Sequence, residues 1–129
     1  MELQAAVETL DKLRPVLPRQ VSFAVADGSR FVFYQSSELI DLGIRPGDPL
    51  REGMLTWRAV RERRALAQMM ESNPFHVPYF AASVPITKGD EVQGCVTAIY
   101  PPSMAPVPRL SFLIGRAEDR WIPVPLHEI

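Results

Sequence analysis

The feature that most constrains this chain is a pair of strand–turn–strand patterns separated by a helical middle. The first joins residues 21–27 to residues 30–35 across an Asp-Gly-Ser turn, with apolar, β-branched and aromatic positions on both sides. The second joins residues 79–86 to residues 92–100 across a turn that contains Gly89. Because early and late strands both need partners, we expect them to share one antiparallel sheet.

The N-terminal residues have the periodicity of an amphipathic helix. Apolar positions recur at coiled-coil spacing through residues 2–14, and the pattern stops at Pro15 and Pro18. The positions in this stripe are Leu3, Ala6, Leu10, Leu13 and Leu17. About two heptads are too few to hold a coiled coil alone, so the stripe predicts either packing on the protein's own sheet or contact with a second copy.

The middle of the chain is expected to supply two helices and one more strand. Residues 36–43 predict a short helix with a serine cap and Gly43 at its end. After a loop over residues 44–53, residues 54–66 have helical periodicity, and residues 66–72 predict a weaker strand. The apolar face of the longer helix consists of Leu55, Ala59 and Val60, with Trp57 at its edge.

This order of elements is typical of a PAS-like fold. We therefore predict an α+β protein with a PAS-like five-stranded antiparallel sheet, helices over one face, an N-terminal helix and a C-terminal hairpin. Residues 1–100 would form the sensory domain with its N-terminal helix. Residues 101–109 hold four prolines in nine residues and predict a stiff linker, and residues 110–129 predict the hairpin.

Composition and charge favour a soluble binding protein over a nucleic-acid-binding or membrane protein. The formal charge is -1, from 14 basic and 15 acidic residues, so the chain has no excess of cations to neutralise phosphates. Cys95 is the single cysteine, which fits a reducing cytoplasm, and the N-terminus lacks the pattern of a signal peptide. No apolar run is long enough for a membrane span. We expect a cytoplasmic location, with no membrane and no DNA binding by this chain alone.

Several motifs follow one another in a characteristic order along the chain. An Asp-containing hairpin precedes Gly-Asp-Pro-Leu with Glu-Gly, a helix, Phe-His-Val-Pro-Tyr, and two strands with Pro-Ile and Gly-Cys-Val. In this order residues 10–100 resemble the sensor region of cytosolic bacterial chemoreceptor-like signalling proteins, which implies a PAS-like sensory domain. His76 stands where that pattern has glycine, and Cys95 stands where alanine is usual.

The C-terminal residues carry a second resemblance. Residues 110–129 contain a turn followed by Pro-Leu-His-Glu-Ile, and they resemble the opening hairpin of a LytTR-type DNA-binding domain. Together the two resemblances imply the sensory half of a bacterial LytTR-type transcription regulator. Some twenty residues are too few to fold as that output domain, so a complete one is not expected here.

A ligand site is predicted where residues 75–86 enter the late hairpin. Tyr79, Ala81 and Ser83 share one face of this strand, and the small side chains leave room beside the tyrosine. We predict Tyr79 and Ser83 as ligand-binding residues, together with Trp57 and Arg58 from the helix. This set would give an aromatic wall with a cation, which suits an anionic small molecule. Ordinary sheet packing is the alternative for the strand residues.

A haem or metal site is the alternative for the histidine of the same segment. His76 could act as an axial ligand with Cys95 or Met104, because haem sensors use histidine, cysteine and methionine ligands. However, His76 and His127 form no metal-spaced pair, and Met104 lies in the proline-rich segment. A surface or turn histidine is therefore expected, and we predict neither a metal nor a cofactor.

The sequence favours a regulatory module over an enzyme. It contains no nucleophile elbow, no phosphate-binding loop and no clustered histidines or aspartates. We predict a regulatory sensor module of a bacterial transcription regulator or signalling protein, which binds an unknown small-molecule ligand or forms a homodimer to control an output domain. The alternatives are a dimerisation module without a ligand and a haem-binding gas or redox sensor.

Overall fold

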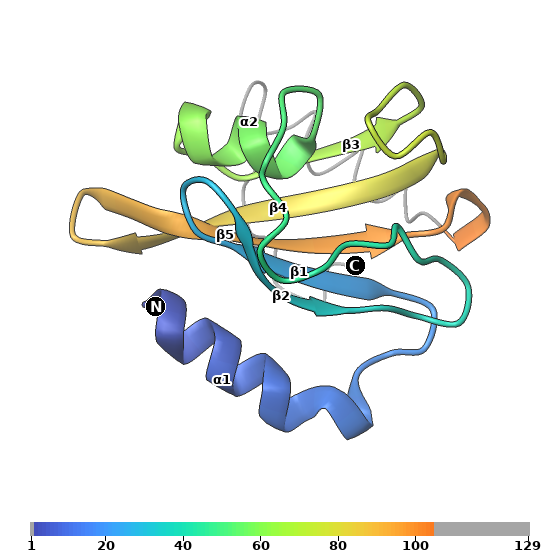
Figure 1. Cartoon of the computed structure of the whole chain (residues 1–129), viewed down its shortest axis with the longest axis horizontal. Helices are drawn as coiled ribbons and strands as arrows, with labels where there is room; N and C mark the ends of the chain where they lie inside the picture. The colour runs from blue at the N-terminus through green and yellow to red at the C-terminus, as the bar shows by residue number, and fades with distance from the viewer. Residues whose placement is uncertain (1, 105–129) are drawn as a thin grey trace, which may run out of the picture.

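The structure is a computed structural model that describes residues 2–104 of the chain. A single antiparallel sheet lies at its centre, with helix α1 (Leu3–Leu13) on one face and helix α2 (Leu55–Glu62) on the other (Figure 1). Short 3-10 turns follow α1 at Arg14–Val16 and end the described part at Pro102–Met104. The predicted C-terminal hairpin and most of the predicted linker lie outside the described residues.

The sheet has five strands in the spatial order β2-β1-β5-β4-β3. The strands are β1 (Ser22–Ala26), β2 (Phe31–Gln35), β3 (Leu66–Met70), β4 (Tyr79–Lys88) and β5 (Glu91–Tyr100). All four neighbouring pairs are antiparallel. The prediction of an α+β protein built on a PAS-like five-stranded antiparallel sheet is therefore confirmed, and the late hairpin forms its two longest strands.

The turn between β1 and β2 is held by the side chain of Asp27. Its Oδ1 accepts hydrogen bonds from the backbone N–H groups of Ser29 and Arg30, both at 2.7 Å. Partial burial pushes the pKa of Asp27 upward, but these hydrogen bonds outweigh burial and leave the pKa below its ordinary value. The turn is thus stabilised by the ionised carboxylate.

Helix α1 packs on the protein's own sheet. Ala6 is buried against Val25 and Phe33, with Leu3, Val7 and Leu10 beside them. At Gly94 the backbone of β5 comes so close to this layer that a Cβ atom would meet the carbonyl oxygen of Ala26 and the side chain of Leu3. Packing on the sheet, one of the two roles predicted for the apolar stripe, is the one that the structure shows.

Helix α2 covers the opposite face and is shorter than predicted. Leu55, Thr56 and Ala59 are its buried residues, and the expected apolar position Val60 is half-buried. The helix ends at Glu62 because Arg63 adopts a left-handed conformation with φ 59°. Residues 64 and 65 then lead directly into β3, so the predicted extension of the helix to residue 66 is wrong.

The short helix predicted over residues 36–43 is also wrong, because this segment is an irregular loop. Local side chains take the backbone groups that a helix would pair. Ser37 Oγ accepts from Ile40 N at 3.0 Å and Asp41 Oδ1 accepts from Gly43 N at 2.9 Å. Tyr34 OH accepts from the backbone N–H of the residue between them, Leu42, at 2.9 Å and donates to Asp41 Oδ1 at 2.9 Å. These bonds fix the loop beside α2, on the same face of the sheet, where Ile40 and Leu42 pack with Leu55.

Candidate functional site

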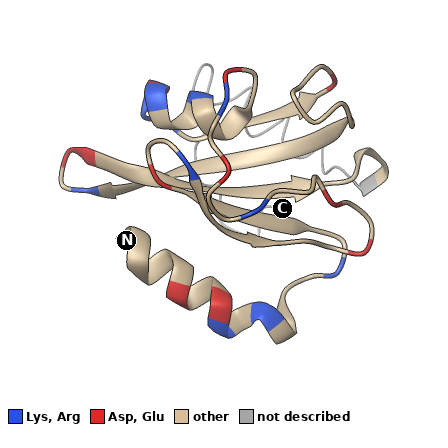
Figure 2. Ribbon diagram, viewed as in Figure 1, with Lys and Arg blue, Asp and Glu red and all other residues tan. Residues whose placement is uncertain are grey.

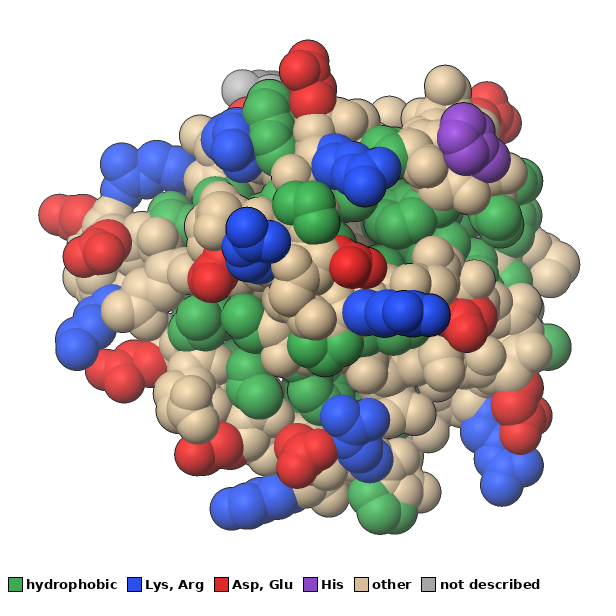
Figure 3. Space-filling view, viewed as in Figure 1, with side chains coloured by type: hydrophobic (Ala, Val, Ile, Leu, Met, Phe, Trp, Pro, Cys, Tyr) green, Lys and Arg blue, Asp and Glu red, His purple; other side chains and the backbone are tan. Residues whose placement is uncertain are grey.

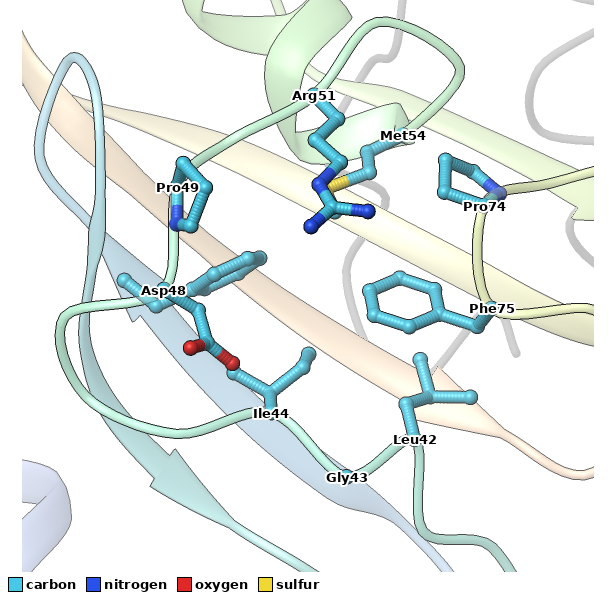
Figure 4. Close-up of a pocket in the computed structure, with 10 residues that line it drawn as sticks. Leu42, Gly43, Ile44, Asp48, Pro49, Arg51, Met54, Pro74 and Phe75 are labelled. Atoms are coloured by element: carbon cyan, nitrogen blue, oxygen red, sulfur yellow. The ribbon is translucent and has the colours of Figure 1, made fainter.

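An open cavity lies between the loop over residues 42–54 and the loop that precedes β4. Its volume is about 210 Å³, and Figure 4 shows side chains from both loops pointing into it. The lining residues are Phe31, Leu42, Gly43, Ile44, Asp48, Pro49, Arg51, Met54, Pro74 and Phe75. Cavities that hold drug-sized ligands are usually larger, at ~300–1,000 Å³, so this outer cavity suits a small molecule.

The first wall of the outer cavity is tied to the start of β2. Phe31 N donates to Asp48 O at 2.8 Å, and Gly47 N donates back to Phe31 O at 2.7 Å. Leu50 N donates to Ser29 O at 2.8 Å, which extends the pairing by one step. The Gly-Asp-Pro-Leu segment therefore runs beside β2 like a short strand, and Gly47 supplies the positive φ of 100° that its turn requires.

The second wall is a tight loop organised by Asn73. Its Nδ2 donates to Met70 O and Val77 O, both at 2.9 Å, and its Oδ1 accepts from Phe75 N at 2.8 Å. This network directs the Phe75 ring into the outer cavity, where it packs edge-on against Tyr79 with ring centroids 6.2 Å apart. The residue that follows, His76, adopts the unfavourable left-handed conformation, with a φ of 59°, where the chain bends.

Two opposite charges lie at the outer cavity. Asp48 is half-buried, and its Oδ2 accepts from Arg45 N at 2.9 Å. Arg51 extends its guanidinium into the space between Pro49 and Phe75 (Figure 4). Among residues 2–104 the ion pairs involve other side chains, and none joins Arg51 to Asp48 or to another carboxylate. The outer cavity thus combines apolar walls with one cation and one anion.

A much smaller inner cavity of about 10 Å³ lies behind the outer one. Five residues line both cavities: Phe31, Leu42, Ile44, Met54 and Phe75. The inner lining adds Leu55, Thr56, Tyr79, Ala81, Thr97 and Ile99, which come from α2 and the sheet. Because these five shared side chains line both cavities, their movement would connect the outer cavity to the inner one.

Hydroxyl groups line the deep side of the inner cavity. Thr97 Oγ1 shares hydrogen bonds of 2.7 Å with Thr56 Oγ1 of α2 and with Ser83 Oγ of β4. The three residues expose between 1% and 5% of their surface, and Cys95 Sγ lies 3.7 Å from Thr97 Oγ1. This chain of hydroxyls links the first turn of α2 to the centre of the sheet.

The structure brings two of the four predicted ligand residues to this region. Tyr79 is 2% exposed and lines the inner cavity, and burial raises its pKa to about 12, so the phenol remains protonated. Ser83 is 1% exposed and bonds to Thr97, which lines the inner cavity, but is not itself among the lining residues. A ligand contact by either residue stays a prediction.

The other two predicted residues lie on α2 and line neither cavity. Trp57 packs at the border of the core, with the Arg61 guanidinium 4.1 Å from its ring centroid. Arg58 donates to Glu62 Oε2 at 3.1 Å and to Gln68 Oε1 at 2.7 Å. Their contact with a ligand also stays a prediction. Sequence reasoning instead missed Arg51 and Phe75, although both lie in motifs that carried the family resemblance.

The residues considered as axial ligands have different environments. His76 is exposed on its turn, whereas Cys95 is fully buried in β5 and burial raises its pKa to about 11. The side chain of Met104 and all of His127 lie outside the described residues. Within residues 2–104 no three histidine, cysteine or acidic side chains gather as a metal site.

The surface carries charges of both signs. Figure 2 shows basic and acidic residues interspersed over α1, α2 and the loops, and the space-filling view shows apolar side chains between them (Figure 3). Arg58, Arg61 and Arg64 are partly neutralised by Glu62 or stacked on Trp57, as a solvated helix face would be. No helix in the described part of the chain is long and apolar enough to cross a bilayer.

Solved structures share this arrangement of helices and strands. A chain in the crystal structure of the E. coli DhaR(N)–DhaL complex aligns with a TM-score of 0.59 and 18% identity, over 90% of this protein and 44% of that chain. The GAF domain of a two-component sensor histidine kinase from Bacillus halodurans aligns with a TM-score of 0.53 and 16% identity, over 89% and 88% of the two chains. The fold is GAF/PAS-like.

At these identities the GAF/PAS-like assignment concerns the fold alone, and this protein spans less than half of the chain from the DhaR(N)–DhaL complex. No family model and no curated protein matches the sequence. In this GAF/PAS-like protein the two cavities lie on the face of the sheet that α2 covers, and loop residues 42–54 lead straight into that helix.

Proposed function

We propose that this protein is a regulatory, non-catalytic sensor module that binds a small molecule in the outer cavity. The observation that carries the proposal is the pocket itself, in which apolar walls from two loops meet a few convergent polar groups. The GAF/PAS-like fold supports it, because one structural neighbour is the GAF domain of a sensor histidine kinase. Tyr79 and Ser83 would then mark the deep end of the site.

The position of the outer cavity supplies a route from ligand to output. Met54 lines both cavities and is the residue immediately before α2, and Thr56 in the first turn bonds to Thr97 of the sheet. A ligand that displaces the side chain of Met54 or of Phe75 favours one position of α2 over another. Only such a difference in affinity between two arrangements can drive a switch.

The experiment is a ligand screen on a cavity-filling variant and its matched control. Purified protein is melted with a defined set of amino acids, small carboxylates, amines and sugars at millimolar concentration, and native mass spectrometry checks for a retained ligand. Binding to the folded state raises Tm, with about 2.7 kcal/mol gained at a hundredfold excess over Kd. We expect Leu42→Trp to abolish the shift, because Leu42 lines both cavities.

Leu39→Trp is the control, since Leu39 lies in the same loop, is 54% exposed and lines neither cavity. It should leave the shift intact. If no compound shifts Tm in the parent protein and no ligand is retained, the small-molecule proposal fails.

The second candidate is a homodimerisation module without a ligand. Leu13, the last residue of α1, is 42% exposed, and Val16, in the 3-10 turn that follows, is 73% exposed, although Leu3, Ala6 and Leu10 of the stripe pack on the sheet. Sedimentation of the parent protein and of a Leu13→Ser/Val16→Ser variant tests this surface. A concentration-dependent dimer that the variant loses, without any ligand response, would favour the second candidate.

The whole protein would be a LytTR-type transcription regulator. This rests on the resemblance of residues 110–129 alone, which lie outside the described residues. The 129 residues should not bind an operator specifically at physiological salt, whereas a form extended by a LytTR-type domain should. Specific binding by the 129 residues alone would contradict the assignment.

A further inference from the structure

We propose that the outer cavity recognises a small apolar α-amino acid, or a close analogue that carries one ammonium and one carboxylate group. In this arrangement Arg51 binds the carboxylate, Asp48 binds the ammonium, and the apolar walls receive the side chain. The inference rests on the proposed sensor function and specifies the ligand class of the same site.

Arg51 is the group that points to a carboxylate. Its guanidinium extends into the mouth of the outer cavity (Figure 4), and within residues 2–104 it takes part in none of the ion pairs. The other arginine considered for this role, Arg58, is already paired with Glu62 and Gln68. A guanidinium binds a carboxylate through two parallel N–H bonds, which gives geometry as well as charge.

Asp48 is the group that rules out a simple anion. One of its carboxylate oxygens accepts from Arg45 N, and this bond fixes the carboxylate beside the outer cavity. A ligand that carried only negative charge would therefore meet an unfavourable neighbour as well as Arg51. An ammonium group on the ligand converts that repulsion into attraction, so the pair of charges selects against plain carboxylates.

The size and lining of the outer cavity define the rest of the ligand. The volume of about 210 Å³ leaves room for a small molecule only. Beyond the two charges, the side chains that line the cavity are apolar and include Phe31, Ile44, Met54 and Phe75. A branched or aromatic side chain would displace water from these surfaces, whereas a second charged group would have no partner among them.

The test compares each amino acid with analogues that lack one charge. Leucine, 4-methylpentanoate and 3-methylbutylamine form one series, and phenylalanine, 3-phenylpropanoate and 2-phenylethylamine form the other. Calorimetry on the full chain measures Kd for each compound. We expect at least one amino acid to bind about tenfold or more tightly than either of its singly charged analogues.

Variants then assign the two charges. Arg51→Gln should weaken the amino acid and the carboxylate by about tenfold or more but leave the amine unchanged, because only the carboxylate contacts Arg51. Asp48→Asn keeps the oxygen that accepts from Arg45 N and should weaken the amino acid while leaving or improving the carboxylate. Arg45→Gln, in the same loop but outside the lining, is the matched control and should bind normally.

The outcomes separate this inference from the proposed function. Equal affinity for an amino acid and its singly charged analogue, or no response to the two variants, overturns the zwitterion assignment. If none of these compounds binds but another compound gives a Tm shift that Leu42→Trp abolishes, the sensor proposal stands and the ligand class is wrong. If nothing binds in either experiment, both proposals fail.

Discussion

Replacing Thr97 by valine isolates the energetic role of the buried hydroxyl chain. Valine has nearly the shape of threonine, and it suits the centre of β5, so the change removes the hydroxyl with little effect on packing. It leaves the hydroxyls of Thr56 and Ser83 without their common partner in a region that is at most 5% exposed. The core then contains two unsatisfied buried hydroxyls.

The magnitude follows from the number of groups left unpaired. Each buried hydroxyl that loses its partner costs about 1–3 kcal/mol, and Thr56 can recover part of this by turning to a backbone carbonyl three or four residues earlier, just before α2. We expect Thr97→Val to lower the free energy of unfolding by about 2–4 kcal/mol. Ser83→Ala should cost only about 1 kcal/mol, because Thr97 keeps its bond to Thr56.

Urea unfolding followed by far-UV circular dichroism measures these differences at constant m. The triple variant Thr56→Val/Ser83→Ala/Thr97→Val removes all three of these buried hydroxyls and should recover most of the stability lost in Thr97→Val. A Thr97→Val variant within about 0.5 kcal/mol of the parent, or a triple variant as unstable as the sum of its parts, would refute the reasoning.

Three further predictions concern single residues. His76→Gly should stabilise the protein by about 0.5–1 kcal/mol in the same urea assay, because glycine adopts the φ of 59° without strain; His76→Ala should give no such gain. Asp27 has a lowered pKa, so its contribution is present above its unfolded value near 3.8 and is lost as the pH falls through the folded value. Asp27→Asn should reduce this loss of unfolding free energy at low pH, measured in a pH series. An unchanged loss would show that other carboxylates cause it. The Cys95 thiol has a pKa of about 11 and is buried, so a disulfide reagent at pH 8 should label the native protein only as fast as it unfolds. Rapid labelling of the native protein would show that the strand opens locally.

The sheet could be predicted because its signal is local. Alternation and turn residues define β1, β2, β4 and β5 within short windows, since side chains on a strand alternate between faces. His76 occupies a left-handed position with φ 59°, which glycine adopts without strain, and the sequence alone did not reveal it. The end of α2 was misplaced because periodicity continues past Glu62, while the backbone turns at Arg63.

The outer cavity depended on contacts between distant residues. Arg51 and Phe75 both line it because Asp48 pairs with Phe31, Leu50 pairs with Ser29 and Asn73 folds its own loop, and no periodicity records such hydrogen bonds. The sequence by itself determined the strands, the N-terminal helix and the PAS-like order of elements, since these follow from side-chain patterns along the chain. Only the tertiary structure decided which irregular loops face each other, and therefore which apolar side chains surround Asp48 and Arg51, because residues 47–50 pair with residues 29–31, which lie far from them in sequence.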